Sequence, residues 1–561
     1  MLSTAERLLE RMKALGVDYV FGNAGTDFPP IIEAFARAAG TGADLPSPIV
    51  VAHETAAVGM AHGFYLATGR AQCVMVHVNV GLANAAMGIL NAAADNVAIL
   101  ICSGRTPITE HGRHGSRSRP IHWGQEMRDQ GAMVREAVKW DYELRYPEQG
   151  GFVVERALAI AGSDPPGPVY LSLPREVLAE TTSPPPVTTR QRPVKAGAPR
   201  AEAVGAAVEI IRRAASPVII AQRPPAPGNW EALATLADRF AIPVVDFWAT
   251  RSVIGTDHPM YVGGDPAAWL ADADAVITVE AMVPWLANAG SVGSSPKVIA
   301  VGVDPLFQRV PARSFPVDVA LAGDPALTLA ALADGLRVHE QEGRDAILRR
   351  RQAVAQRRHI ARSLAAERAA KGAGAPMSRA WLSRCLSEAK AETAAVFNEL
   401  GCDPSVMRFE RPDTYFSAPL SGGLGWALPA ALGYQLADRD REVIACVGDG
   451  SYIFANPLAC HLVAMANHLP VLTVVVNNGL WQAVRRATLA MYPDGNAARA
   501  NVMPFTELTP GLDYAAIARA HGCFGERVAD GAALPEVIDR ALKIVRKERS
   551  PALIDAIIAP D

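Results

Sequence analysis

Two short apolar runs near the end of the chain flank the segment that says most about its function. Val443–Val447 and Val471–Val476 are almost entirely apolar, which is typical of strands buried in a parallel sheet. Between them a helical apolar pattern extends to about Asn467 and ends at Leu469-Pro470. This order predicts a βαβ unit with a right-handed crossover, so that both strands end at the same edge of the sheet. Ligands bind at that edge in open α/β sheets.

The same alternation of apolar runs and helical patterns fills three segments of the chain. We predict an α/β protein of three doubly wound domains, each with a mostly parallel sheet, over residues 1–182, 200–335 and 376–561. Thr181–Pro199, rich in Pro and Thr, is the clearest linker. The strands of the first two domains are expected at Pro48–Ala52, Gln72–His77, Val97–Cys102, Pro168–Leu173, Pro217–Ala221, Pro243–Phe247, Ala275–Val279 and Lys297–Val301.

Composition narrows the class of protein. The chain has 561 residues, half of them hydrophobic, and a net charge of −3, so neither nucleic acid nor an anionic membrane is an expected partner. The charged helix Arg344–Lys371 is interpreted as a solvated connection and not as a nucleic-acid patch. The N-terminus predicts an amphipathic helix and not a signal peptide, and no apolar run is long enough to span a bilayer. Seven scattered cysteines without a CxxC motif indicate reduced thiols and a cytoplasmic location.

The two turns of the βαβ unit carry candidate ligands. Gly448 and Gly450 allow close approach of the backbone, and a helix that starts near Ser451 favours a phosphate. Asp449 offers an anionic oxygen and Asn478 a neutral one, a combination that suits Mg²⁺ shared with a phosphorylated ligand. The alternative is a structural turn followed by an unrelated Asn pair.

The order GDG, 26 residues with a strand–helix–strand pattern, and NN resembles the diphosphate–magnesium motif of thiamine diphosphate (ThDP) enzymes. The whole chain resembles the superfamily of decarboxylases, acetolactate synthases and benzoylformate decarboxylases. That resemblance implies a pyrimidine-binding domain, a central domain and a diphosphate-binding domain. It also implies at least a homodimer, and favours a homotetramer, because the cofactor of these enzymes lies between the first domain of one subunit and the third domain of another.

The resemblance assigns ligands residue by residue. Asp449, Asn478 and the carbonyl of Leu480 match the magnesium ligands, and Leu424 matches the apolar residue that props the cofactor into its bent shape. The residues implied to contact the cofactor are Gly25, Thr26, Glu54, Glu399, Gly401, Gly422, Leu424, Gly448, Asp449, Gly450, Ser451 and Asn478.

Three residues are implied to be catalytic. Glu54 matches the glutamate that meets the aminopyrimidine ring and helps the cofactor lose its C2 proton; by itself it is also a plausible helix-capping carboxylate. His77 matches a histidine that assists proton transfer in benzoylformate decarboxylase, and a structural histidine is the alternative. Gln125 matches an active-site glutamine of acetolactate synthases and pyruvate oxidases, and Thr26 stands where a substrate-binding serine sits.

Three features depart from the family pattern. Ala281–Asn288 lacks the central-domain histidine of benzoylformate-type enzymes. Arg223-Pro224-Pro225 replaces a glycine-rich turn that approaches FAD in acetolactate synthases, and because proline removes an N–H donor, FAD is not expected. A basic loop forms either a carboxylate-binding lid or a solvated surface, and its residues are His111, Arg113, His114, Arg117 and Arg119.

These observations predict a ThDP- and Mg²⁺-dependent enzyme that decarboxylates a small 2-oxo acid, joins it to a second carbonyl compound, or does both. The alternatives are an acetolactate synthase proper with FAD, a flavin oxidase, a lyase or hydrolase acting on a 1,2-dicarbonyl, and a catalytically silent regulatory subunit. Intact Glu54 and Asp449 favour an enzyme over the regulatory subunit.

Overall fold

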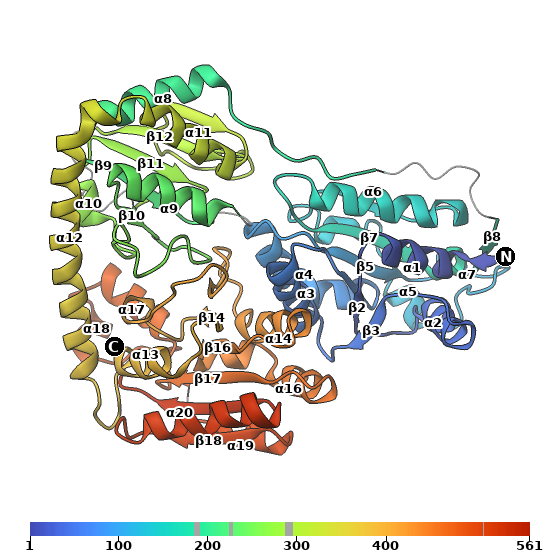
Figure 1. The fold of residues 1–561 in the computed structure, drawn as a ribbon. Coiled ribbons are helices and arrows are strands. Elements are labelled where there is room, and N and C mark those ends of the chain that lie inside the picture. Colours follow the sequence, from blue (N-terminus) through green and yellow to red (C-terminus); the bar gives the residue numbers. More distant parts are fainter. Residues whose placement is uncertain (184–190, 224–227, 287–294, 509, 561) are drawn as a thin grey trace.

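A computed structural model describes residues 1–183, 191–223, 228–286, 295–508 and 510–560. It contains three α/β domains in which every strand pair of the three main sheets is parallel (Figure 1). The predicted fold class is therefore confirmed. Part of the predicted linker, residues 184–190, lies outside the described residues.

The first domain has a six-stranded sheet in the order β3-β2-β4-β5-β7-β6. A two-stranded antiparallel ribbon, β1 with β8, joins its two ends. Its elements are β1 Leu2–Ser3, α1 Thr4–Ala14, β2 Tyr19–Gly22, α2 Pro29–Thr41, β3 Ser47–Val50, α3 Glu54–Thr68, β4 Cys73–Val76, α4 Val78–Ala94, β5 Leu100–Arg105, α5 Ile121–Gly124, β6 Asp141–Glu143, α6 Gly150–Gly162, β7 Val169–Pro174, α7 Arg175–Ala179 and β8 Thr181–Thr182.

The central domain has a five-stranded sheet in the order β10-β9-β11-β12-β13. Its elements are α8 Ala201–Arg213, β9 Pro217–Ala221, α9 Asn229–Phe240, β10 Val244–Val245, α10 Ala267–Leu270, β11 Ala275–Val279, β12 Lys297–Gly302, β13 Val319–Ala322 and α11 Pro325–Arg337.

The last domain repeats the strand order of the first, as β15-β14-β16-β17-β19-β18. Its elements are α13 Arg379–Ala389, β14 Ala395–Glu399, β15 Tyr415–Ser417, α14 Ala427–Ala437, β16 Val443–Gly448, α15 Asp449–Phe454, α16 Pro457–Ala466, β17 Val471–Asn477, α17 Gln482–Met491, α18 Asn496–Ala500, α19 Tyr514–Ala520, β18 Phe524–Val528, α20 Leu534–Lys543 and β19 Ala552–Ile557.

Both six-stranded sheets reverse their strand order at one place, where ligands of open α/β sheets bind. The reversal lies between β2 and β4 in the first domain and between β14 and β16 in the last domain. The turns that follow β2, β4, β14 and β16 therefore stand at two matching switch points. Gly25, His77, Gly401 and Asp449 fall at these turns, whereas Glu54 follows β3 and Asn478 follows β17.

The long helix α12, Glu340–Ala370, runs along one side of the molecule from the central domain to the last domain (Figure 1). Arg350 donates to the carbonyls of Ala214 and Phe240, while Arg368 forms a 2.6 Å ion pair with Asp403. The prediction of a connecting helix is confirmed, and basic residues such as Arg350 and Arg368 make contacts within the chain.

The sequence predicted one helix between β16 and β17. This prediction is wrong, because the structure has two helices there, α15 and α16. Asn456 lies between α15 and α16 with a left-handed backbone, at φ 53°, and Pro457 begins the second helix. A proline at the first helical position cannot donate to the preceding turn, so the chain starts a new helix at this point.

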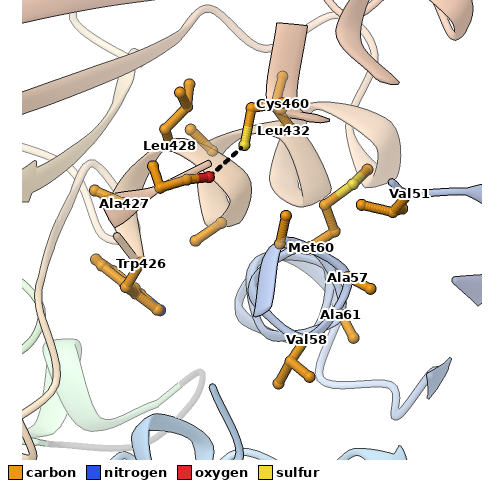
Figure 2. Packing of buried hydrophobic residues seen from close by; sticks show 14 of the residues in the cluster. Val51, Ala57, Val58, Met60, Ala61, Trp426, Ala427, Leu428, Leu432 and Cys460 are labelled. Carbon is orange, nitrogen blue, oxygen red and sulfur yellow. Dashed lines mark hydrogen bonds between the residues drawn. The ribbon is translucent and has the colours of Figure 1, made fainter. Parts of the chain in front are cut away.

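The first and last domains share a core in which α3 packs against α14 (Figure 2). The two helices touch through glycines: a Cβ on Gly63 would lie 1.8 Å from the Ala430 carbonyl oxygen, and one on Gly433 would lie 1.9 Å from that of Met60. A larger residue at Gly63 or Gly433 would push α3 and α14 apart. The two glycines therefore fix how closely the first and last domains pack.

Candidate active site

Asp449 ties the two turns of the βαβ unit together. Its carboxylate accepts backbone hydrogen bonds from Gly450 at 2.8 Å, Asn478 at 3.1 Å and Gly479 at 2.7 Å. Burial raises the pKa of Asp449 despite these donors. A cation bound beside this carboxylate would offset the cost of its burial.

The donor set around Asp449 fits a magnesium ion. Asn478 turns its side-chain oxygen toward the Leu480 backbone, which donates to it at 3.0 Å, and all three residues line a cavity of about 230 Å³. Among the described residues no group of three His, Cys, Asp or Glu side chains is placed to hold a metal. One carboxylate, one amide and one main-chain carbonyl are nevertheless oxygen ligands of the kind that Mg²⁺ takes, together with phosphate oxygens.

The same cavity has the glycine-rich lining that a diphosphate needs. Five of the residues for which the resemblance implies cofactor contacts line it, namely Gly448, Gly450, Ser451, Gly422 and Leu424. A Cβ on Gly450 would lie 2.2 Å from the Trp481 ring, so only glycine fits there.

Glu399 and Gly401, for which the resemblance implies cofactor contacts, are not among the described residues that line this cavity. The Glu399 carboxylate accepts from the backbone N–H groups of Gly425 at 2.6 Å and Ala427 at 2.7 Å, and burial raises its pKa to about 7. It thereby caps α14 and fixes the loop that presents Leu424. A Cβ on Gly401 would lie 2.4 Å from the main chain of Cys446, so this glycine is needed for packing.

Glu54 stands at the matching edge of the first domain, as the first residue of α3. Its carboxylate is buried and accepts hydrogen bonds from the side chains of Asn23 at 2.9 Å and Asn84 at 3.1 Å. His53 accepts from the Thr55 backbone and provides the helix cap. Because the cap is supplied by His53, the Glu54 side chain is available for another task.

His77, which caps α4, lies in a chain of polar side chains with Asp27 and Gln125. Its Nδ1 is 2.5 Å from Asp27 Oδ1, and its Nε2 is 3.2 Å from the Gln125 amide nitrogen. The hydrogen bond to Asp27 raises the pKa of His77 against the effect of burial, and the nearby Glu54 carboxylate raises it further. The structure thus brings His77 and Gln125 together, two residues 48 positions apart.

Gly25 and Thr26 differ in their surroundings. A Cβ on Gly25 would fall 2.0 Å from His77 Nδ1, so glycine is required for the imidazole to approach the turn after β2. The Thr26 side chain is exposed, and its carbonyl accepts from Arg175 at 3.1 Å.

The basic loop splits into anchored and exposed residues. Arg117 is largely buried: it pairs with Glu126, donates to the Pro107 carbonyl at 2.8 Å, and lies 5.2 Å from the centre of the Trp123 ring. Arg113 pairs with Glu180 at 2.9 Å. The guanidinium of Arg117 is therefore committed within the chain, while His111, His114 and Arg119 are exposed.

The central sheet ends in turns that hold charged side chains. Arg223 donates to the Ala94 carbonyl, and the buried Glu280 carboxylate accepts from the Val303 backbone at 2.8 Å. Burial raises the pKa of Glu280. Pro224 and Pro225, and Ala287 and Asn288 of the segment compared for a histidine, lie outside the described residues.

The two halves of the candidate site remain separate within one chain. Every described residue that lines the cavity around Asp449 belongs to the last domain, from Arg379 to Arg486. The hydrogen-bond partners of Glu54, by contrast, both belong to the first domain.

Sequence reasoning missed three polar residues of the first half. Asn23 lies two positions before Gly25, Asn84 lies seven positions after His77, and Asp27 directly follows Thr26, but none of the three was assigned a role. The signal for Asn23 and Asp27 is a polar side chain in the segment that follows β2, whereas Asn84 lies on the helix that follows β4. Such residues are common in loops, so the pattern alone does not single them out.

The fold places Asp449, Asn478 and a glycine-lined cavity at the carboxyl edge of a parallel sheet, where ligands of open α/β sheets bind. Three domain families match the chain: the thiamine pyrophosphate enzyme N-terminal TPP binding domain at residues 2–133, the central domain at 204–332 and the C-terminal TPP binding domain at 400–556. The chain belongs to the thiamine diphosphate-dependent enzymes.

Relatives match over nearly the full length. A benzoylformate decarboxylase of Pseudomonas aeruginosa is 29% identical, with 97% of each chain covered. An acetolactate synthase large subunit of Parasynechococcus marenigrum is 26% identical over 99% of this chain and 87% of its own. The crystal structure of benzoylformate decarboxylase from Polynucleobacter necessarius superposes with a TM-score of 0.78 at 22% identity, covering 100% of this chain and 99% of the other.

Proposed function

We propose that this enzyme uses ThDP and Mg²⁺ to decarboxylate a small 2-oxo acid, to join it to a second carbonyl compound, or to do both. The observation that carries the proposal is Asp449, whose carboxylate joins the turn after β16 to the turn after β17. The benzoylformate decarboxylase and acetolactate synthase relatives support a 2-oxo acid as the substrate class.

The last domain would hold the cofactor. Asp449, Asn478 and the Leu480 carbonyl would bind the metal, and the start of α15 at Gly450 and Ser451 would face the diphosphate. When bound, ThDP supplies the carbon nucleophile that adds to the substrate carbonyl.

The first domain would supply the residues that transfer protons. Glu54, held by Asn23 and Asn84, would share a proton with the cofactor's aminopyrimidine ring. His77 and Gln125 would face the substrate, and a raised pKa keeps His77 protonated to higher pH than a free histidine. An imidazolium there would attract a carboxylate and donate a proton to a substrate oxygen.

A complete site needs two copies of the chain, because Glu54 and Asp449 line separate surfaces of one copy. We infer a homodimer at least, and favour a homotetramer. A groove of about 540 Å³ beside Ala52 and His53 supports a second copy as the partner. Large apolar side chains are exposed in or beside this groove, namely Ile453, Phe454, Leu458, Leu462 and Leu512.

The proposal includes no FAD, since the charged side chains of Arg223 and Glu280 occupy the turns after β9 and β11. It places the enzyme in the cytoplasm, because all seven cysteines are free thiols. Within the described residues, every helix is too short or too polar to traverse a bilayer.

A panel of 2-oxo acids tests the proposal, with CO₂ and carboligation products measured together. We expect CO₂ release from at least one 2-oxo acid, dependent on both ThDP and Mg²⁺, from protein without a flavin absorbance band. Gln125 favours carboligation as a second outcome, because it matches the acetolactate synthase glutamine. Release that persists in metal- and ThDP-free enzyme would contradict the proposal, and stoichiometric flavin would favour an acetolactate synthase proper.

A further inference from the structure

Asp27 is a buried carboxylate that uses both of its oxygens within one turn of the first domain. Its side chain is 3% exposed, whereas that of His77 is 20% exposed. Oδ1 lies 2.5 Å from His77 Nδ1, and Oδ2 accepts from the Val78 backbone at 3.2 Å. The carboxylate is therefore hydrogen-bonded both to the side chain of His77 and to the backbone N–H of the next residue.

The packing around this pair allows one arrangement. A Cβ on Gly104 would lie 1.5 Å from Asp27 Oδ2, and a Cβ on Gly25 would lie 2.0 Å from His77 Nδ1. Val78 adopts φ 31°, a left-handed backbone that is strained for a β-branched residue. Two glycines and one strained residue at a single contact indicate that the surrounding fold determines its geometry.

The charges that face the pair are few. Glu54 is the other carboxylate that acts on His77, and Gln125 is the neutral group at Nε2. Arg175 is the cation near Asp27: burial lowers the pKa of its guanidinium, and the carboxylates of Glu176 and Asp27 oppose that shift. The imidazole thus has an anion on its Nδ1 side and an amide, which can donate or accept, on its Nε2 side.

We propose that Asp27 is a positioning residue that holds His77 with its proton on Nδ1, so that Nε2 exchanges protons with the substrate. This inference rests on the proposed function, because it requires His77 to take part in the reaction. When His77 is neutral, the Gln125 amide nitrogen donates to Nε2. When Nε2 is protonated, its proton goes to the substrate oxygen and is later replaced from water. A carboxylate fixing the tautomer of a catalytic imidazole is the arrangement of Ser-His-Asp enzymes.

The Asp27→Asn substitution keeps the size and position of the side chain but removes its negative charge. Its side-chain oxygen can still accept from the Val78 N–H, so its NH₂ then faces His77 Nδ1 and forces the proton onto Nε2. Because the two side chains have the same size, we expect the fold to be retained. Asp18→Asn is the matched control: Asp18 precedes β2 at the opposite edge of the sheet, is 30% exposed and pairs with Arg70.

The first readout needs neither cofactor nor substrate. Diethyl pyrocarbonate modifies neutral imidazole, so its rate at the His77 peptide, followed by mass spectrometry against pH, reports the protonation of His77. We expect Asp27→Asn to move the midpoint to lower pH, because a hydrogen-bonded anion is lost, while Asp18→Asn leaves it in place. The exposed His359 serves as an internal reference in all three proteins. An unchanged midpoint would overturn the proposal even if decarboxylation had been demonstrated.

The second readout uses the holoenzyme and the best 2-oxo acid. We expect Asp27→Asn to lower kcat roughly 10- to 100-fold, which is less than the roughly 10²–10⁴ that the acid–base group itself contributes, with little change in KM. The alkaline limb of the kcat profile should move to lower pH, since the protonated imidazole is lost sooner as pH rises. A shifted midpoint with unchanged kcat would also overturn the positioning role. A failure of the panel to find any substrate would contradict the proposed function and leave the modification profile as the test of the pair.

Discussion

Replacement of Asp449 by alanine is expected to abolish cofactor retention and activity. The substitution removes the anionic metal ligand and leaves the N–H groups of Gly450, Asn478 and Gly479 without their acceptor. A contact to a charged group contributes about 1.5–3 kcal/mol, so the loss of the metal ligand should weaken ThDP binding roughly 10- to 150-fold. Calorimetric titration of ThDP into the dialysed apoenzyme, with and without Mg²⁺, measures this change.

Asp449→Asn provides the control for this experiment. An asparagine oxygen can accept from part of the same backbone groups, so this variant should unfold close to the parental temperature, yet it lacks the charge that a divalent cation needs. We expect weak ThDP binding with little response to Mg²⁺. Stoichiometric ThDP that survives dialysis of the alanine variant would overturn the assignment of Asp449.

The second large effect is expected for Glu54→Gln, which should bind ThDP but no longer activate it. The amide has the shape of the carboxyl but cannot pass a proton to the aminopyrimidine ring. One of the two asparagines, Asn23 or Asn84, would turn its own amide to meet the new NH₂ group, so the fold should persist. Loss of such a contact in a dry site costs about 2.7–4 kcal/mol, roughly 10²–10³ in rate.

Hydrogen–deuterium exchange at C2 of bound ThDP measures this step without any substrate. The exchange is quenched in acid, and the released cofactor is examined by NMR. We expect slow exchange in Glu54→Gln and rapid exchange in an Arg113→Gln control, whose side chain is exposed and pairs with Glu180. Parental exchange in the glutamine variant would exclude this role for Glu54.

The central strands of the three sheets were predictable because they are buried on both faces, whereas edge strands such as β3, β13 and β18 are partly exposed. β16 and β17 show as apolar runs, and the polar residues that interrupt them stand at the strand ends that form the Asp449 cavity. The break between α15 and α16 was missed, since the apolar pattern continues across Asn456 and only the backbone reveals the kink.

Contacts between distant residues were not predictable in the same way. Asp27 is 50 positions from His77, and nothing in the local pattern at Asp27 indicates which turn it will meet. Glu399 likewise reaches across 26 and 28 positions to cap α14, a task that the family pattern does not suggest. The choice between a lid and a solvated loop could not be made from sequence, because the partner of Arg117 is Glu126, nine positions away, which nothing in the local pattern singles out.

Mixed oligomers of Glu54→Gln and Asp449→Ala copies test directly whether the active site is shared between two chains. In a shared site, one of the two sites in a mixed pair has both native residues, so the pair should bind about one ThDP and exchange its C2 proton at the parental rate. Each variant alone should fail, the first in exchange and the second in binding. Isolation through two different affinity tags gives the mixed species. Slow C2 exchange in the isolated mixed oligomer would contradict a site built from Glu54 of one chain and Asp449 of the other.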